Sequence, residues 1–346
     1  MAITNLNDKI NPDQKVVVVV EQPLSTTQVN KSFKTRLTSM KSKMKSKKMS
    51  KKDDNALIQL IWITPALAFI ALFIFFSAFI VFKNGFNKFP LDIKWEFTFD
   101  VFTAVARDET FQRALINSLM YVAFVVPIGL IFSIGVAKAL SALLSKRMFS
   151  FLQGIFFLPY VTSAMAVAMA FAFMFSSNDA GIFNKLLGAF GIKPISWLED
   201  PKYAIVTVFI FGIWRSLPFQ IVMLTTAFMR INTQYYSAAS VDGMKKWKQF
   251  WRVSIPQIVP TIIYLVTVGI IGSFKALPLG LFGSEKKAES VNAQTIVFWI
   301  YDRTTGAGGI QSNQMAGAAS IILLAIILAV TIINRQITKM LNKRYR

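Results

Sequence analysis

The chain has 346 residues, of which 54% are hydrophobic, and its mean hydropathy is +0.50. Soluble domains usually contain about 45–50% apolar residues, so this composition favours an integral membrane protein. Without Cys or His, the sequence excludes disulfides, thiolate chemistry, His-based zinc sites and imidazole acid–base catalysis. The net charge of +21 lies in tails and short loops between apolar segments, which argues for a topology signal and against nucleic-acid binding.

Residues 1–55 form a polar, Lys-rich segment that culminates in KTRLTSMKSKMKSKKMSKKDDN. Such a segment cannot bury enough apolar surface to offset its ordering entropy, so we predict a largely disordered cytoplasmic tail. We expect it to fix the orientation of the chain and to contact anionic lipid headgroups, with a specific binding function as the alternative. The charged region is far too long for a signal peptide, so a retained membrane anchor is predicted from Ala56 onward.

Six apolar stretches are long enough to cross a bilayer core of about 30 Å, which needs roughly 20 helical residues. These stretches are residues 56–82, 114–144, 152–175, 203–229, 258–277 and 315–333. Residues 56–346 are therefore predicted to form an all-α transmembrane domain with six spans. Lys138, near one end of the second stretch, is expected to extend towards the membrane surface.

The Lys and Arg residues indicate the orientation of the spans. They gather in the N-terminal tail, between the second and third spans, in residues 230–257 and after the last span. Cytoplasmic loops carry an excess of Lys and Arg, so both termini and residues 230–257 are predicted to lie in the cytoplasm, with the chain in the cell membrane. The other connections are long and hold most acidic residues, and they either contact an extracellular partner or form a structural cap.

Three polar residues in or near the spans are candidates for a translocation pathway, namely Arg215, Gln220 and Lys275. Arg215 lies near the middle of the fourth span, where a charge is costly unless it faces protein or water. The alternative for Arg215 is a structural role, capping carbonyl groups that Pro218 frees. Gln220 can instead bond a neighbouring helix, and Lys275 can extend to the outer surface.

Residues 230–257 form a polar, basic island between the fourth and fifth spans. Asn232 is a suitable N-cap for a short helix over Thr233–Val241. The pair Asp242-Gly243 ends this helix, because Gly243 suits the left-handed conformation that follows a helix C-terminus.

A second amphipathic stretch follows the glycine. Its large apolar side chains share neighbouring faces, and they are Trp247, Phe250, Trp251 and Ile255. Pro256 is then predicted to open the fifth span. The island therefore predicts a helix-turn-helix across the membrane surface, with an ordinary amphipathic helix anchored by tryptophans as the alternative.

The sequence from Gly212 to Pro260 resembles the cytoplasmic loop and flanking helices of ABC importer permeases, especially the carbohydrate-uptake branch. The family pattern reads Glu-Ala-Ala, three residues, Gly, nine residues, Ile, any residue, Leu-Pro. The matching positions here are Ser237, Ala238, Ala239, Gly243, Val253, Ile255 and Pro256. The spacing is kept throughout, and the main departure is Ser237 in place of Glu.

The resemblance implies a type I ABC importer permease fold in which residues 230–257, here called the coupling loop, dock on a separate ATPase subunit. The coupling residues that it implies are Ser237, Ala238, Ala239, Asp242, Gly243, Trp247, Phe250, Ile255 and Pro256. Ser237 lacks the charge of the family's Glu, so we expect docking to depend more on shape and small residues.

The resemblance also implies the partners of the chain: a second homologous permease, two ATP-binding subunits and an extracellular substrate-binding protein. The first span and its basic extension resemble the larger of two paired sugar permeases. The sequence contains no phosphate loop of the form Gly, four residues, Gly-Lys-Ser/Thr. ATP and Mg are therefore expected on the partner subunits, and no cofactor, metal site or catalytic residue is expected in this chain.

The predicted function is import of a sugar or related solute, driven by ATP. Within the ABC class, glycerol phosphate, phosphate, polyamine and peptide are alternative solutes. A stand-alone secondary transporter predicts carboxylates within the spans, and the six stretches contain neither Asp nor Glu. A membrane enzyme would need a cluster of His, Cys or paired acids, which the spans also lack.

Overall fold

The computed structural model describes residues 58–88, 95–142, 146–178, 181–306 and 312–345. The basic tail predicted over residues 1–55 lies outside them. Regular structure in the described residues is helical, apart from one isolated antiparallel bridge between Asn87 and Phe97. The chain divides into two units between Phe75 and Phe76.

In the first unit, the described residues from Ile58 are helical and end in a π-helical turn, η1 (Ala71–Phe75). Their large apolar side chains are exposed, as expected for a helix that faces lipid. The helix Ile58–Gly85 as a whole is long and apolar enough to cross a membrane.

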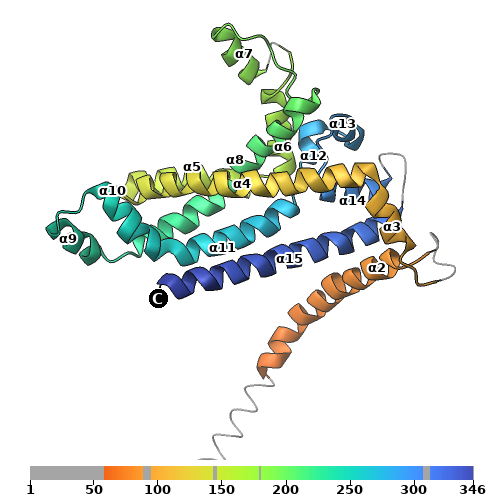
Figure 1. The fold of residues 1–346 in the computed structure, drawn as a ribbon, viewed down its shortest axis with the longest axis horizontal. Helices are drawn as coiled ribbons and strands as arrows, with labels where there is room; N and C mark the ends of the chain where they lie inside the picture. The colour runs from red at the N-terminus through yellow and green to blue at the C-terminus, as the bar shows by residue number, and fades with distance from the viewer. Residues whose placement is uncertain (1–57, 89–94, 143–145, 179–180, 307–311, 346) are drawn as a thin grey trace, which may run out of the picture. The chain divides into compact units, whose positions relative to one another are not determined.

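The second unit is built around long apolar helices, which pack side by side (Figure 1). They are α2 (Phe76–Gly85), α4 (Glu109–Ser141), α8 (Pro201–Met229), α11 (Ile255–Phe274) and α15 (Asn313–Tyr345). Helix α4 contacts both α8 and α11, and α15 contacts both α2 and α11.

Shorter helices connect and cover this bundle. They are α3 (Asp100–Arg107), α7 (Ile182–Ala189), α9 (Thr233–Val241), α10 (Lys246–Gln249), α12 (Leu279–Phe282), α13 (Glu285–Ser290) and α14 (Ile296–Thr305). The sequence analysis predicts connecting loops without regular structure where most of these helices occur. Short helices without long apolar runs have only a weak hydrophobic periodicity, so they are hard to predict.

The third predicted span, residues 152–175, is not one straight helix. It consists of α5 (Lys146–Val161) and α6 (Ala164–Met174), with a bend of 98° between them. Pro159 lies in the last turn of α5, where its missing N–H removes one helical hydrogen bond, and the Thr162 hydroxyl donates to the Pro159 carbonyl at 3.0 Å just before the bend. The described residues therefore contain five helices that can cross a membrane, or six if the bent pair counts as one span.

Small residues allow α2 and α15 to approach closely. A Cβ atom at Gly317 would lie 2.7 Å from the Gly85 nitrogen and 2.9 Å from the Val81 carbonyl oxygen. Gly317→Ala is therefore expected to lower the free energy of unfolding by about 1–3 kcal/mol, because backbone atoms cannot move aside as a side chain can. Thermal unfolding in detergent measures this loss.

The matched control for this prediction is Gly135→Ala. Gly135 also lies inside a long helix, and a Cβ atom there would meet nothing within 4 Å. Its replacement is expected to leave stability unchanged or to raise it slightly, since Ala is the better helix former. Equal stability of the two variants would contradict the close packing of α2 against α15.

Candidate functional site

The first half of the coupling loop folds as the sequence predicts. Helix α9 spans Thr233–Val241, and the Asn232 side chain accepts a hydrogen bond from the Gln234 N–H at 2.9 Å. Gly243 has φ +72°, in the left-handed region where other residues are strained. The Met244 N–H donates to the Ala239 carbonyl at 2.9 Å, which closes the helix end.

The second half of the loop differs from the expectation. Helix α10, the π-helical turn η2 (Phe250–Ser254) and α11 form one continuous helix, Lys246–Phe274. Pro256 lies in the first turn of α11 as predicted, but the helix does not break before it. A proline ring clashes with the carbonyl four residues earlier in a regular α-helix, and the wider π turn just before Pro256 changes that geometry.

Three polar contacts tie the halves of the loop together. The Gln249 side chain donates to Ser240 Oγ at 3.0 Å and to the Met244 carbonyl at 2.8 Å. The Tyr236 hydroxyl lies 2.8 Å from Ser254 Oγ in η2. These contacts hold α9 and the start of the long helix as one unit, located at one end of the bundle (Figure 1).

The coupling loop presents a continuous exposed surface around Gly243. The residues predicted for coupling that are exposed are Ser237, Ala238, Asp242, Gly243 and Trp247, whereas Ala239, Phe250, Ile255 and Pro256 are partly or fully buried and support them. The ring centroid of Trp247 lies 5.7 Å from that of Trp251. Val241, which the sequence reasoning missed, is 88% exposed beside the turn.

A cavity of about 380 Å³ opens among α4, α6, α8, α11 and α12. Its lining is largely apolar, with Tyr121, Phe211 and Arg215 among the larger side chains. The Arg215 guanidinium donates a hydrogen bond to the Pro159 carbonyl, next to the bend between α5 and α6. The capping role predicted for Arg215 is therefore wrong in its partner, because Arg215 caps a carbonyl of α5 and Pro218 lies inside the unbroken helix α8. The side chain of Arg215 also lines the cavity.

The other two pathway candidates lie elsewhere. Gln220 is buried between α4 and α8, where its Oε1 accepts a hydrogen bond from Ser133 Oγ at 2.9 Å. Lys275 is exposed at the C-terminal end of α11. Neither residue lines the cavity beside Arg215. The structure therefore does not bring the three candidates into one site.

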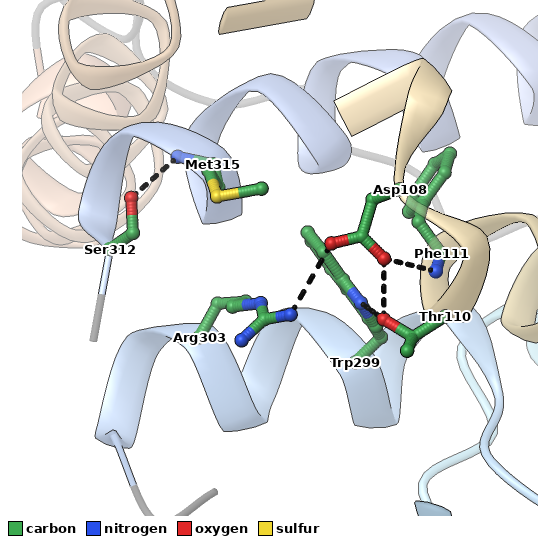
Figure 2. A network of polar contacts seen from close by, with 7 residues as sticks. All are labelled: Asp108, Thr110, Phe111, Trp299, Arg303, Ser312 and Met315. Atoms are coloured by element: carbon green, nitrogen blue, oxygen red, sulfur yellow. Dashed lines mark hydrogen bonds and ion pairs between the residues drawn. The ribbon is translucent and has the colours of Figure 1, made fainter. Parts of the chain in front are cut away.

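A polar network, absent from the sequence reasoning, joins the start of α4 to α14 (Figure 2). Asp108 accepts hydrogen bonds from the Phe111 N–H at 3.0 Å and the Thr110 hydroxyl at 2.5 Å. Arg303 lies 3.4 Å from the second Asp108 oxygen and 4.9 Å above the ring of Trp299. Trp299 in turn donates to the Thr110 hydroxyl at 2.8 Å. The network fixes α14 against α4.

The family of binding-protein-dependent transport system inner membrane components has a model that matches residues 126–346. A probable ABC transporter permease protein of Mycoplasma pneumoniae is 31% identical over 271 residues, covering 76% of this chain and 79% of that protein. The arabinooligosaccharides transport system permease AraP of Halalkalibacterium halodurans is 26% identical over 239 residues, with coverages of 68% and 73%. The lactose transport system permease LacF of Rhizobium radiobacter is 30% identical over 203 residues, with coverages of 57% and 66%.

A solved structure shares the fold of this chain. The crystal structure of a bacterial alginate ABC transporter, in complex with an alginate pentasaccharide-bound periplasmic protein, contains a chain that aligns with a TM-score of 0.70. The alignment covers 85% of this chain and 98% of that chain at 21% identity. Because the family model matches more than half of the sequence, the resemblance found in the coupling loop is confirmed. The chain belongs to the family of binding-protein-dependent transport system inner membrane components.

Proposed function

We propose that this permease subunit imports a sugar or short oligosaccharide, driven by ATP on separate subunits. The exposed turn at Gly243 is the observation that carries the proposal, because it offers a rigid docking element in a chain that has no phosphate loop of its own. Two relatives are named for arabinooligosaccharide and lactose transport, which supports a carbohydrate as the solute.

We infer that the cavity beside Arg215 is part of the solute pathway. Its volume of about 380 Å³ falls within the range of small-molecule pockets, which is about 300–1,000 Å³. The rings of Tyr121 and Phe211 offer flat apolar surfaces, and the Arg215 guanidinium offers N–H donors to hydroxyl or carboxylate oxygens. Gln220 and Lys275 are not assigned to this pathway.

The proposed complex contains a second homologous permease, two ATP-binding subunits that hold ATP and Mg, and an extracellular substrate-binding protein. Gentle purification from native membranes, followed by identification of the bound partners, tests this composition. We expect ATP hydrolysis by the complex to rise when a sugar-loaded binding protein is added. If a binding protein loaded with phosphate, polyamine or peptide stimulated hydrolysis instead, that compound would replace sugar as the proposed solute. Uptake by the isolated chain without ATP would indicate a secondary transporter.

We also propose that both termini and the coupling loop face the cytoplasm, since Lys and Arg gather there. The sequence contains no Cys, so single cysteines can be introduced at Lys246 and Glu289. In intact cells, a membrane-impermeant thiol reagent is expected to label only Glu289→Cys, and after permeabilisation it is expected to label both. Labelling of Lys246→Cys in intact cells would reverse the proposed orientation.

A further inference from the structure

We propose that Lys138 and Tyr236 form a clamp that passes the motion of α9 to α4. The inference rests on the proposed function, because it takes α9 as the element that docks on an ATPase subunit. Lys138 and Tyr236 are positioning residues in this scheme: they act through the helices and do not contact the solute.

The ammonium group of Lys138 lies in the last turn of α4 and faces two aromatic rings. Its nitrogen is 5.3 Å from the ring centroid of Phe228, near the end of α8, and 5.1 Å from that of Tyr236 on α9. Both distances lie within the range of about 6 Å in which a cation is attracted to a ring face. Lys138 is half-buried, so these contacts differ from the expected extension to the membrane surface.

Within the part of the chain that the structure describes, no carboxylate forms an ion pair with Lys138. The positive charge of Lys138 therefore interacts with the two aromatic rings. A half-buried ammonium without a counterion holds its aromatic partners more strongly than an exposed one, because less water competes for the charge. The arrangement thus links the inner ends of α4, α8 and α9 through one side chain.

Tyr236 extends the same link to the fifth span. Its ring face meets Lys138, while its hydroxyl lies 2.8 Å from Ser254 Oγ, which is buried in the π turn η2. Beneath it, Phe228 and Ile231 belong to one apolar cluster at this end of the bundle. A displacement of the Tyr236 ring therefore acts on α4 and on the long helix Lys246–Phe274 together.

The other side-chain hydrogen bonds of α9 lead to α9 itself, to its N-cap residue or to α10. The Ser237 and Ser240 hydroxyls donate to backbone carbonyls of α9 itself, and Ser240 also accepts from Gln249 of α10. Among the described polar and cation–ring contacts of α9, those of Tyr236 alone lead to α4 and η2. We therefore expect motion of α9 to reach α4 through Tyr236, which faces Lys138 and also packs against the apolar cluster that includes Ala137 of α4.

Lys138→Met tests the clamp, because it keeps a long apolar side chain and removes the charge. The measured quantity is ATP hydrolysed per solute imported by the complete complex in proteoliposomes, with association of the ATPase subunits measured alongside. We expect this ratio to rise about fivefold, the change that corresponds to ~1 kcal/mol, with association retained. Lys138→Arg is expected to restore the wild-type ratio, since a guanidinium also binds ring faces.

Lys339→Met is the matched control, because it removes an exposed lysine from the same expected side of the membrane. Its ratio is expected to equal that of the wild type. Tyr236→Leu, which removes both the ring and the hydroxyl, is expected to raise the ratio, and adding Lys138→Met to it should raise the ratio no further.

Two results would overturn the clamp. In one, an active complex that carries Lys138→Met hydrolyses the same amount of ATP per imported solute as the wild type. In the other, Lys138→Met and Tyr236→Leu weaken association or stability while the ratio stays constant, which would indicate a purely structural contact. If instead the wild-type complex showed no ATP-driven import, the proposed function itself would fail, and the clamp with it.

Discussion

Gly243→Val is expected to uncouple ATP hydrolysis from solute import. Gly243 has φ +72°, and a Cβ atom there would meet nothing within 4 Å, so the cost of valine is backbone strain and not a clash. Such strain is about 1–3 kcal/mol, which corresponds to a change of about 5–150-fold in an equilibrium. The turn is expected to relax by changing the angle between α9 and α10. The exposed surface around Val241 and Trp247, which we propose docks on an ATPase subunit, would then lose its shape.

The measurement is uptake and ATP hydrolysis by the reconstituted complex. Gly243→Asn is the conservative control, because Asn tolerates the left-handed conformation, and it is expected to retain most of the coupling. Gly191→Val is the matched strain control: Gly191 has φ +75° with open space around it, but it follows α7 rather than α9. Full coupled transport by Gly243→Val would refute a role of this turn in coupling.

Arg303→Met is expected to lower the free energy of unfolding by about 3 kcal/mol. The side chains of Arg303 and Asp108 are only 10% and 19% exposed, so removal of the guanidinium leaves a largely buried carboxylate without its ion-pair partner. The contact of Arg303 with the Trp299 ring is lost as well. We expect α14 to separate more readily from the start of α4, and thermal unfolding in detergent reports this change.

Lys88→Met is the matched control for the ion pair. Lys88 and Glu96 lie 3.2 Å apart, and their side chains are 50% and 53% exposed. Solvent screens an exposed pair, so its removal is expected to cost less than about 1 kcal/mol. If Lys88→Met destabilised the protein as much as Arg303→Met, burial of the Asp108–Arg303 pair would not explain its contribution.

The structure of α9 and the turn after it could be predicted from local sequence signals. Asn232 and Gly243 determine the two ends of α9, because an N-cap side chain and a left-handed glycine act on the nearest few residues. The family spacing then identifies the loop without reference to the remainder of the fold. Apolar stretches long enough to cross a membrane are also visible in the sequence, because bilayer thickness sets the length that they need, but the third of them is bent in the structure.

Contacts between residues far apart in the sequence could not be predicted in this way. Asp108 and Arg303 are 195 positions apart, and the sequence places them in separate outer connections without a sign that they pair. The partners of Lys138 are equally hidden, because a lysine near the end of a span ordinarily extends towards the headgroups. The 98° bend after Val161 could not be predicted either, because the presence of Pro159 does not show whether the helix bends there or by how much.

Accumulation of a labelled oligosaccharide in proteoliposomes tests the central claim most directly. The wild-type complex would be purified with its bound partners, reconstituted, and supplied with ATP on the side of the coupling loop and with a sugar-loaded binding protein on the other side. We predict accumulation against a gradient that requires hydrolysable ATP and is lost with Gly243→Val. Accumulation that continues without ATP, or without any partner ATPase, would contradict the account.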